Sequence, residues 1–211
     1  IHNPAAARHP AGLWDMGDEN SVFFDALELL LHLPTVDDGA SRGRFRVGSN
    51  EPWRDVAKNT HVEQQASGGE NWNSPVHVNH RGELPFSENG YRLTLDGKQE
   101  RGLRAQPLLQ AYAHDLVITA ELEQFWPQFP SAMSLQQGSL TLAFFPRSEG
   151  GHELQPGERK SLGFSLHIQP IPDVGDGVPA FPDEPLPHAS VTLDPTHVIK
   201  CRLPELGDPA K

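Results

Sequence analysis

The chain has a single cysteine, Cys201, among its 211 residues. One thiol excludes an internal disulfide framework and a cysteine-rich zinc site. No apolar run approaches the roughly 20 residues that a bilayer-spanning helix requires, so we expect no membrane span. Basic residues are also few, since 17 lysines and arginines accompany 28 aspartates and glutamates, for a formal net charge of -11. This balance disfavours nucleic acids and anionic membranes as partners, because both are bound through a basic face.

Proline and glycine, by contrast, are abundant, with 20 and 19 residues. Hydrophobic residues make up 36% of the chain, which is enough to form a core. So many turn-forming residues argue against a helical bundle and favour short strands joined by many turns. We therefore predict an all-β fold, an antiparallel β-sandwich of two packed sheets with long loops and a Pro-rich C-terminal segment.

Alternating apolar and polar residues predict the strands. Residues 21–33 fit both a strand and a helix period, and we favour one long strand that ends at Pro34. Residues 34–60 are polar and are expected to form a long surface connection. Asp96-Gly97 is typical of a hairpin turn, and residues 155–158 of a second turn. Further strands are predicted over residues 61–65, 91–95, 103–112, 116–125, 139–145 and 159–168, and a last one can lie within 189–200.

The chain begins Ile-His-Asn-Pro, with no initiator methionine and no leader-like segment. We therefore expect a piece of a longer protein or a processed chain. Residues 1–20 are interpreted as a loop that arrives from a preceding domain, and residues 21–169 as the β-sandwich domain. Prolines crowd residues 170–211, which are interpreted as a linker or an edge segment.

Polar and aromatic residues are densest in residues 67–81. Gly68-Gly69 allows positive φ angles and the close approach of a ligand. Trp72 offers a flat apolar face, and sugars are bound by such a face together with amides and carboxylates. The alternative is a polar loop in which Trp72 plugs the end of the core. The candidate polar groups of this segment are Glu70, Asn71, Asn73, His77, Asn79 and His80.

His77 and His80 do not form a convincing metal site. In an extended segment, positions i and i+3 point to opposite faces, and no HExxH pattern is present. We predict no metal and no cofactor, and interpret these histidines as hydrogen-bonding groups or a general acid or base. Trp126 lies in a second aromatic, Pro-rich loop, residues 125–130, which can wall a cleft or cap the sandwich.

Four segments carry a family resemblance, in this order: Gly12-Leu13-Trp14-Asp15-Met16-Gly17-Asp18 with Val22-Phe23-Phe24, Ser67-Gly68-Gly69-Glu70-Asn71-Trp72 with His77-Val78-Asn79, Phe125-Trp126-Pro127-Gln128-Phe129-Pro130, and His152-Glu153-Leu154-Gln155-Pro156-Gly157-Glu158. Together they resemble the exo-acting rhamnogalacturonan lyase family. The family's chains have an N-terminal barrel-like β domain, a central β-sandwich and a C-terminal helical toroid. The resemblance covers residues 2–200 of this sequence and corresponds to the family's central β-sandwich.

The resemblance implies β-elimination on an acidic polysaccharide or oligosaccharide. That reaction needs a cation to neutralise the uronate carboxylate, a base and an acid. His77, His80 and Glu70 are then the catalytic candidates, with Arg81 or Arg54 as the carboxylate clamp. The candidates for substrate binding are Asn71, Trp72, Asn79, Arg81 and Trp126. Because the family's site lies where the sandwich meets the toroid, we expect this chain to hold part of a cleft, to need flanking domains, and to be inactive alone.

Two alternatives stay open. The chain can be a non-catalytic carbohydrate-binding module, which Trp72, Trp126 and the amide-rich loop favour. It can also be a structural sandwich that docks neighbouring domains of the same parent chain.

Overall fold

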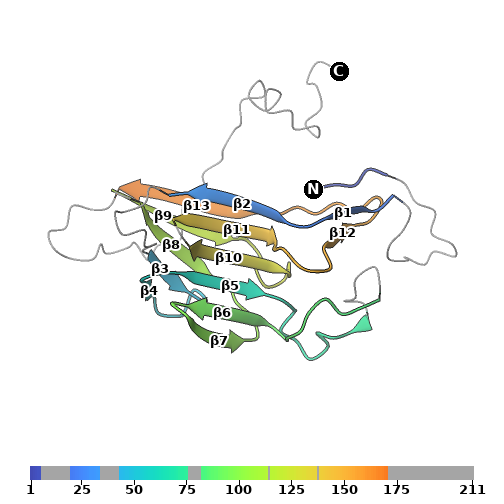
Figure 1. Ribbon diagram of the computed structural model, residues 1–211, viewed down its shortest axis with the longest axis horizontal. Coiled ribbons are helices and arrows are strands. Elements are labelled where there is room, and N and C mark those ends of the chain that lie inside the picture. The colour runs from blue at the N-terminus through green and yellow to red at the C-terminus, as the bar shows by residue number, and fades with distance from the viewer. Residues whose placement is uncertain (6–19, 34–42, 76–81, 114, 137, 171–211) are drawn as a thin grey trace, which may run out of the picture. The chain divides into compact units, whose positions relative to one another are not determined.

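A computed structural model describes residues 1–5, 20–33, 43–75, 82–113, 115–136 and 138–170 (Figure 1). Within these ranges the chain is all-β, in antiparallel sheets, and about half of the described residues lie in strands. They belong to one compact unit, Ile1–Ala180, while a second unit, Phe181–Lys211, lies outside the described residues. No helix in these ranges is long and apolar enough to cross a bilayer. The predicted fold class is confirmed.

Two large sheets form the sandwich, and a two-stranded ribbon adjoins them. The six-stranded sheet has the order β2-β11-β10-β5-β6-β7, with β2 (Leu27–His32), β5 (Thr60–Gln64), β6 (Tyr91–Leu95), β7 (Lys98–Gly102), β10 (Ser131–Gln136) and β11 (Ser139–Phe145). The five-stranded sheet has the order β13-β9-β8-β3-β4, with β3 (Gly43–Arg46), β4 (Arg54–Val56), β8 (Leu108–Ala113), β9 (Leu116–Leu122) and β13 (Phe164–Pro170). The ribbon pairs β1 (Val22–Phe24) with β12 (His152–Leu154).

The core lies between the two large sheets, because most of their strands point alternate side chains toward it. The six-stranded sheet contributes Val62, Leu93, Met133, Leu135, Leu140 and Leu142. The five-stranded sheet contributes Phe45, Val56, Leu109, Ala111, Ile118, Ala120 and Leu122. Burying these side chains supplies the main driving force for folding.

Residues 21–33 form two strands, so the prediction of one long strand is wrong. The predicted alternation is present in β2, where every second residue is exposed. β2 pairs with β11 as far as Leu27↔Phe145, and β1 pairs with β12 from Phe24↔His152. The segment that pairs with residues 22–32 makes a loop between Phe145, at the end of β11, and His152, at the start of β12. The pairing is interrupted at this loop, so residues 22–32 form two strands, β1 and β2.

The predicted surface connection over residues 34–60 is also wrong in its second half. This part contains β3 and β4, which pair with each other, and β3 also pairs with β8. Phe45 and Val56 are fully or almost fully buried, but the residues around them are polar or charged. Two short strands with one or two buried side chains each give too weak an alternation to stand out. Residues 34–42 lie outside the described residues.

The hairpin predicted at Asp96-Gly97 is confirmed and connects β6 to β7. Both turn residues have positive φ angles, 46° and 85°, as a type I′ turn requires. The Asp96 carboxylate also accepts hydrogen bonds from the backbone N–H groups of Ala57, Lys58 and Asn59, at 3.0, 2.7 and 3.0 Å. It therefore ties the hairpin to the turn between β4 and β5.

Asp96→Ala is expected to lower the free energy of unfolding by about 1 kcal/mol, because these exposed backbone donors then bond to water instead. Burial alone would raise the pKa of Asp96, but the three backbone hydrogen bonds outweigh it and lower the pKa below 3.8. The stabilisation is thus present above about pH 4 and is lost as the pH falls through the folded-state pKa. Urea unfolding at neutral and acidic pH measures it, with Asp115→Ala, in the exposed β8–β9 turn, as the control. An equal loss in both variants would contradict the capping role.

The topology brings two loops together at one end of the six-stranded sheet. β5 and β11 are both antiparallel to β10, so they run in the same direction with one strand between them. The chain segments that follow β5 and β11 therefore leave the same end of the sheet (Figure 1).

Candidate functional site

The outer face of the six-stranded sheet is low in its middle and higher at its sides. On the central strands β10 and β11, the leucines at 135, 140 and 142 point into the core. The alternate residues on these strands point outward and are small: Ala132, Ser134, Thr141 and Ala143. The neighbouring strands carry longer outward side chains, His61 and Glu63 on β5 and Glu28 on β2. The small residues therefore form the floor of a depression along the sheet.

Two cavities occupy this region, with volumes of about 1000 and about 210 Å³. The smaller cavity lies over the floor of small residues, and the larger one lies at the sheet end where the loops leave. Glu63, Pro146 and Arg147 line both cavities, so the two adjoin at these residues. We refer to them together as the groove. The volume of the larger cavity is in the range of small-molecule sites.

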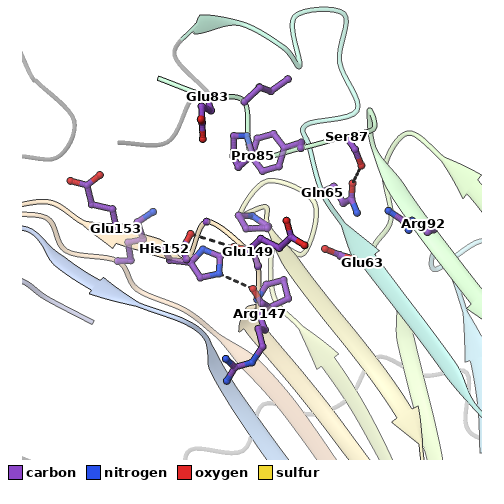
Figure 2. Close-up of a pocket in the computed structure, with 18 of the residues that line it drawn as sticks. Glu63, Gln65, Glu83, Pro85, Ser87, Arg92, Arg147, Glu149, His152 and Glu153 are labelled. Atoms are coloured by element: carbon purple, nitrogen blue, oxygen red, sulfur yellow. Dashed lines mark hydrogen bonds between the residues drawn. The ribbon is translucent and has the colours of Figure 1, made fainter. Parts of the chain in front are cut away.

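The loops after β5 and β11 form the walls of the larger cavity. Figure 2 shows Glu83 and Pro85 on one side and Arg147, Glu149 and His152 on the other. Glu63 on β5 and Arg92 on β6 lie beside these walls, as a pair in register. Phe86 also lines this cavity and packs edge-on against Phe129, with ring centroids 5.5 Å apart. The cavity thus combines charged groups with one aromatic ring.

Each lysine or arginine among the described lining residues lies near a carboxylate. Arg92 is 3.8 Å from Glu88, Arg147 is 3.2 Å from Asp25, and Lys160 is 3.3 Å from Glu158. These three cations accompany five lining carboxylates: Glu63, Glu83, Glu149, Glu153 and Glu158. The described lining is therefore acidic overall, and each of its cations has a carboxylate within 4 Å, although Arg92 shares Glu88 with Arg101, which lies 3.0 Å from it.

Glu63 lies where the two cavities meet and is half-buried, with its side chain 28% exposed. His61 Nε2 is 3.8 Å from Glu63 Oε2. The neighbouring imidazole of His61 lowers the pKa of Glu63 most, burial opposes it, and the side chain of Gln65 and the charges of His61 and Arg92 lower it further. Because the net effect is a lowered pKa, Glu63 is ionised at neutral pH.

His152 forms part of the opposite wall as a neutral side chain. Its Nε2 is 2.7 Å from the carbonyl oxygen of Pro146, to which a neutral ring protonated at Nε2 donates. The ring also packs against Phe24 and Phe145, at centroid distances of 5.4 and 5.1 Å. Burial lowers the pKa of His152, the bond to Pro146 partly offsets this, and the charge of Lys160 lowers it further.

The lowered pKa of His152 makes stability depend on pH. The stabilisation from this group is complete above about pH 6.5, and it is lost as the pH falls toward the lower folded-state pKa, where the buried ring must take up a proton. We expect the unfolding free energies of the wild type and His152→Gln to differ more near neutral pH than at about pH 5. Urea unfolding at both pH values measures this. A difference that stays constant or grows in acid would contradict the assignment.

Glu70, Asn71 and Trp72 follow β5 but do not line either cavity. The side chains of Glu70 and Asn71 are exposed, and Trp72 is half-buried. Gly68 has the predicted positive φ, 68°. A β-carbon at Gly68 would collide with the carbonyl oxygen of Leu103. The close approach that Gly68 allows is therefore that of the protein's own backbone at Leu103.

Trp126 and Arg54, predicted as a cleft wall and a carboxylate clamp, are in contact with the protein itself. The guanidinium of Arg104 lies 4.3 Å from the ring centroid of Trp126, and its Nε donates to the carbonyl oxygen of Ser67. Arg54 Nη1 donates to both carboxylate oxygens of Glu100, at 2.7 and 2.8 Å. Neither Trp126 nor Arg54 lines the groove.

The predicted site residues His77, Asn79, His80 and Arg81 lie outside the described residues. They directly precede, in the sequence, the segment that forms one groove wall. Within the described ranges, no three His, Cys, Asp or Glu side chains are close enough together to hold a metal ion.

Sequence reasoning did not select several groove residues, above all Glu63, Arg92, Arg147 and His152. His152 and Glu153 belong to the fourth segment of the family resemblance, which was a usable signal. Glu63 also had a usable signal, because it is the charged residue that alternates with the apolar Val62 in a predicted strand.

With the geometry established, the chain was compared with protein-family models, curated proteins and solved structures, and none of these comparisons gave a match.

Proposed function

We propose that this β-sandwich binds a polysaccharide segment in the groove and belongs to a polysaccharide lyase-like protein that acts on rhamnogalacturonan. The observation that carries the proposal is that the two cavities adjoin along the sheet at Glu63, Pro146 and Arg147. An elongated groove fits a chain-like ligand better than a compact one. Its carboxylates, guanidiniums and amides are the groups that hydrogen-bond to sugar hydroxyls.

The groove also offers an apolar surface. Leu84, Pro85 and Phe86 line one wall of the larger cavity. A sugar ring has C–H faces as well as hydroxyls, and it packs against aromatic and proline rings. This mixture of one apolar wall and many polar groups suits a carbohydrate.

The chemistry of the lining disfavours the alternative in which the groove only docks a neighbouring domain. The centre of a protein interface is depleted in charged residues and enriched in large apolar ones. Nine of the described residues lining the larger cavity are histidine or charged, and three of its apolar residues are prolines. A protein partner would have to desolvate these charges, whereas a sugar can replace water with its hydroxyls.

The lyase part of the proposal rests on the family resemblance. The segment His152-Glu153-Leu154-Gln155-Pro156-Gly157-Glu158 supports it, because its residues 152, 153, 155 and 158 line the larger cavity. We propose that the domain contributes part of a cleft that flanking domains complete. The chain alone should therefore bind substrate but release no unsaturated uronate product, which ultraviolet absorbance would detect.

Titration of the chain with rhamnogalacturonan oligosaccharides, followed by calorimetry, tests the binding. We expect saturable binding with a stoichiometry of one. Absence of binding at millimolar oligosaccharide would contradict the proposal and favour the structural docking role.

A further inference from the structure

We infer that Glu63 makes the groove select a neutral sugar, rather than a uronate, at the point where its two cavities meet. This inference rests on the proposed function, since it names the kind of sugar that the same groove binds. Glu63 lines both cavities, so a polysaccharide lying along the groove has to pass this residue.

The surroundings of Glu63 keep its carboxylate charged and oriented. It is paired in register with Arg92 on β6 and lies 3.8 Å from His61 on its own strand. Most of its side chain is covered, and the residue lines both cavities. An ionised carboxylate has two acceptor oxygens, and adjacent hydroxyls of a neutral pyranose can donate to both.

A uronate at the same position would place a second carboxylate against Glu63. Like charges at a half-buried site repel each other strongly, because water screens them poorly. A nearby free cation would relieve the repulsion, but Arg147 and Lys160 each already lie within 4 Å of a carboxylate. Arg92 already faces two carboxylates, because it is paired in register with Glu63 and lies 3.8 Å from Glu88. In a polymer that alternates neutral and acidic sugars, the neutral ring is therefore the one placed at Glu63.

A matched pair of ligands tests this inference. The first is an oligogalacturonate, in which every ring is a uronate, so that every register along the groove places a carboxylate at Glu63. The second is the same oligosaccharide after chemical reduction of its carboxyl groups, which converts each galacturonate into galactose. We expect wild-type protein to bind the reduced form about tenfold more tightly. In Glu63→Gln the reduced form should lose about tenfold in affinity, because a charged acceptor is replaced by a neutral one. The acidic form should lose less, so that the preference disappears.

Asp115→Asn is the control, because it removes an exposed carboxylate in the β8–β9 turn and should keep the wild-type preference. Equal binding of the two forms to wild-type protein, or tighter binding of the acidic form, would overturn the inference but leave the proposed function intact. An unchanged preference in Glu63→Gln would also overturn it. If rhamnogalacturonan oligosaccharides do not bind to folded wild-type protein in the titration described above, the proposed function fails, and the inference fails with it. If they bind but the reduced oligogalacturonate does not, the inference alone fails. The wild-type comparison decides the matter even if Glu63→Gln does not fold.

Discussion

Gln64→Leu is expected to lower the free energy of unfolding by about 3–5 kcal/mol, because it leaves several backbone groups at the end of β5 without a partner. Gln64 is fully buried. Its Nε2 donates to the carbonyl oxygens of Ala66 and Leu103, at 2.6 and 2.9 Å, and its Oε1 accepts from the N–H of Ala105, at 3.0 Å. Leucine fills a similar volume but satisfies none of these groups.

Gln99→Leu is the matched control, because Gln99 is exposed on the edge strand β7 and the same substitution there should change stability by less than about 0.5 kcal/mol. Urea unfolding of both variants gives the comparison. Gln64 also fixes the point at which the chain leaves β5 toward the groove wall, so Gln64→Leu should weaken oligosaccharide binding as well. If Gln64→Leu lowers the free energy of unfolding by less than about 1 kcal/mol, water molecules satisfy the backbone groups in place of the glutamine side chain.

The parts of the fold that the sequence predicted best are those with a strong local pattern. The strand expected over residues 91–95 is β6 with the same bounds, and the strand over residues 139–145 is β11. In both, apolar and polar residues alternate next to a turn signal. Asp96-Gly97 was found for a related reason, since few residue pairs adopt two positive φ angles readily.

Other strands had no such pattern. β7 has the sequence Lys-Gln-Glu-Arg-Gly and is exposed along almost its whole length, so it is a strand because β6 pairs with it. β10 has the sequence Ser-Ala-Met-Ser-Leu-Gln, whose small residues give a weak hydrophobic signal although most of them are buried. Pairing with a partner determines such strands, and pairing is not visible in a local window.

The groove was harder to predict than the fold. Its floor consists of Ala132, Ser134, Thr141 and Ala143. No sequence pattern marks these small residues as a binding surface, because they form a depression only next to the larger side chains of the neighbouring strands. Its walls come from segments that are about 60 residues apart and meet only because β5 and β11 run in the same direction. The sequence did indicate one contributor, the segment 152–158. The polar residues after Gly69, which drew the strongest prediction, are mostly exposed or outside the described residues.

Ser134→Trp is expected to abolish measurable binding of rhamnogalacturonan oligosaccharides, with a loss of at least about 100-fold. Ser134 lies at the centre of the groove floor, between Thr141 and His61 in register. The cavity above it has a volume of about 210 Å³, and an indole would occupy much of it. Since the side chain points away from the core, the free energy of unfolding should change by less than about 1 kcal/mol.

Ser165→Trp provides the control, because it places the same side chain on the other sheet, on the half-exposed strand β13. Calorimetric titration of the wild type and both variants should show binding in the wild type and Ser165→Trp alone, with thermal unfolding confirming that all three are folded. Unimpaired binding by folded Ser134→Trp would show that the ligand does not lie over the floor of the groove. The polysaccharide would then have to bind elsewhere, and the exposed residues Glu70 and Asn71 would be the next to substitute, because they follow β5 without lining the groove.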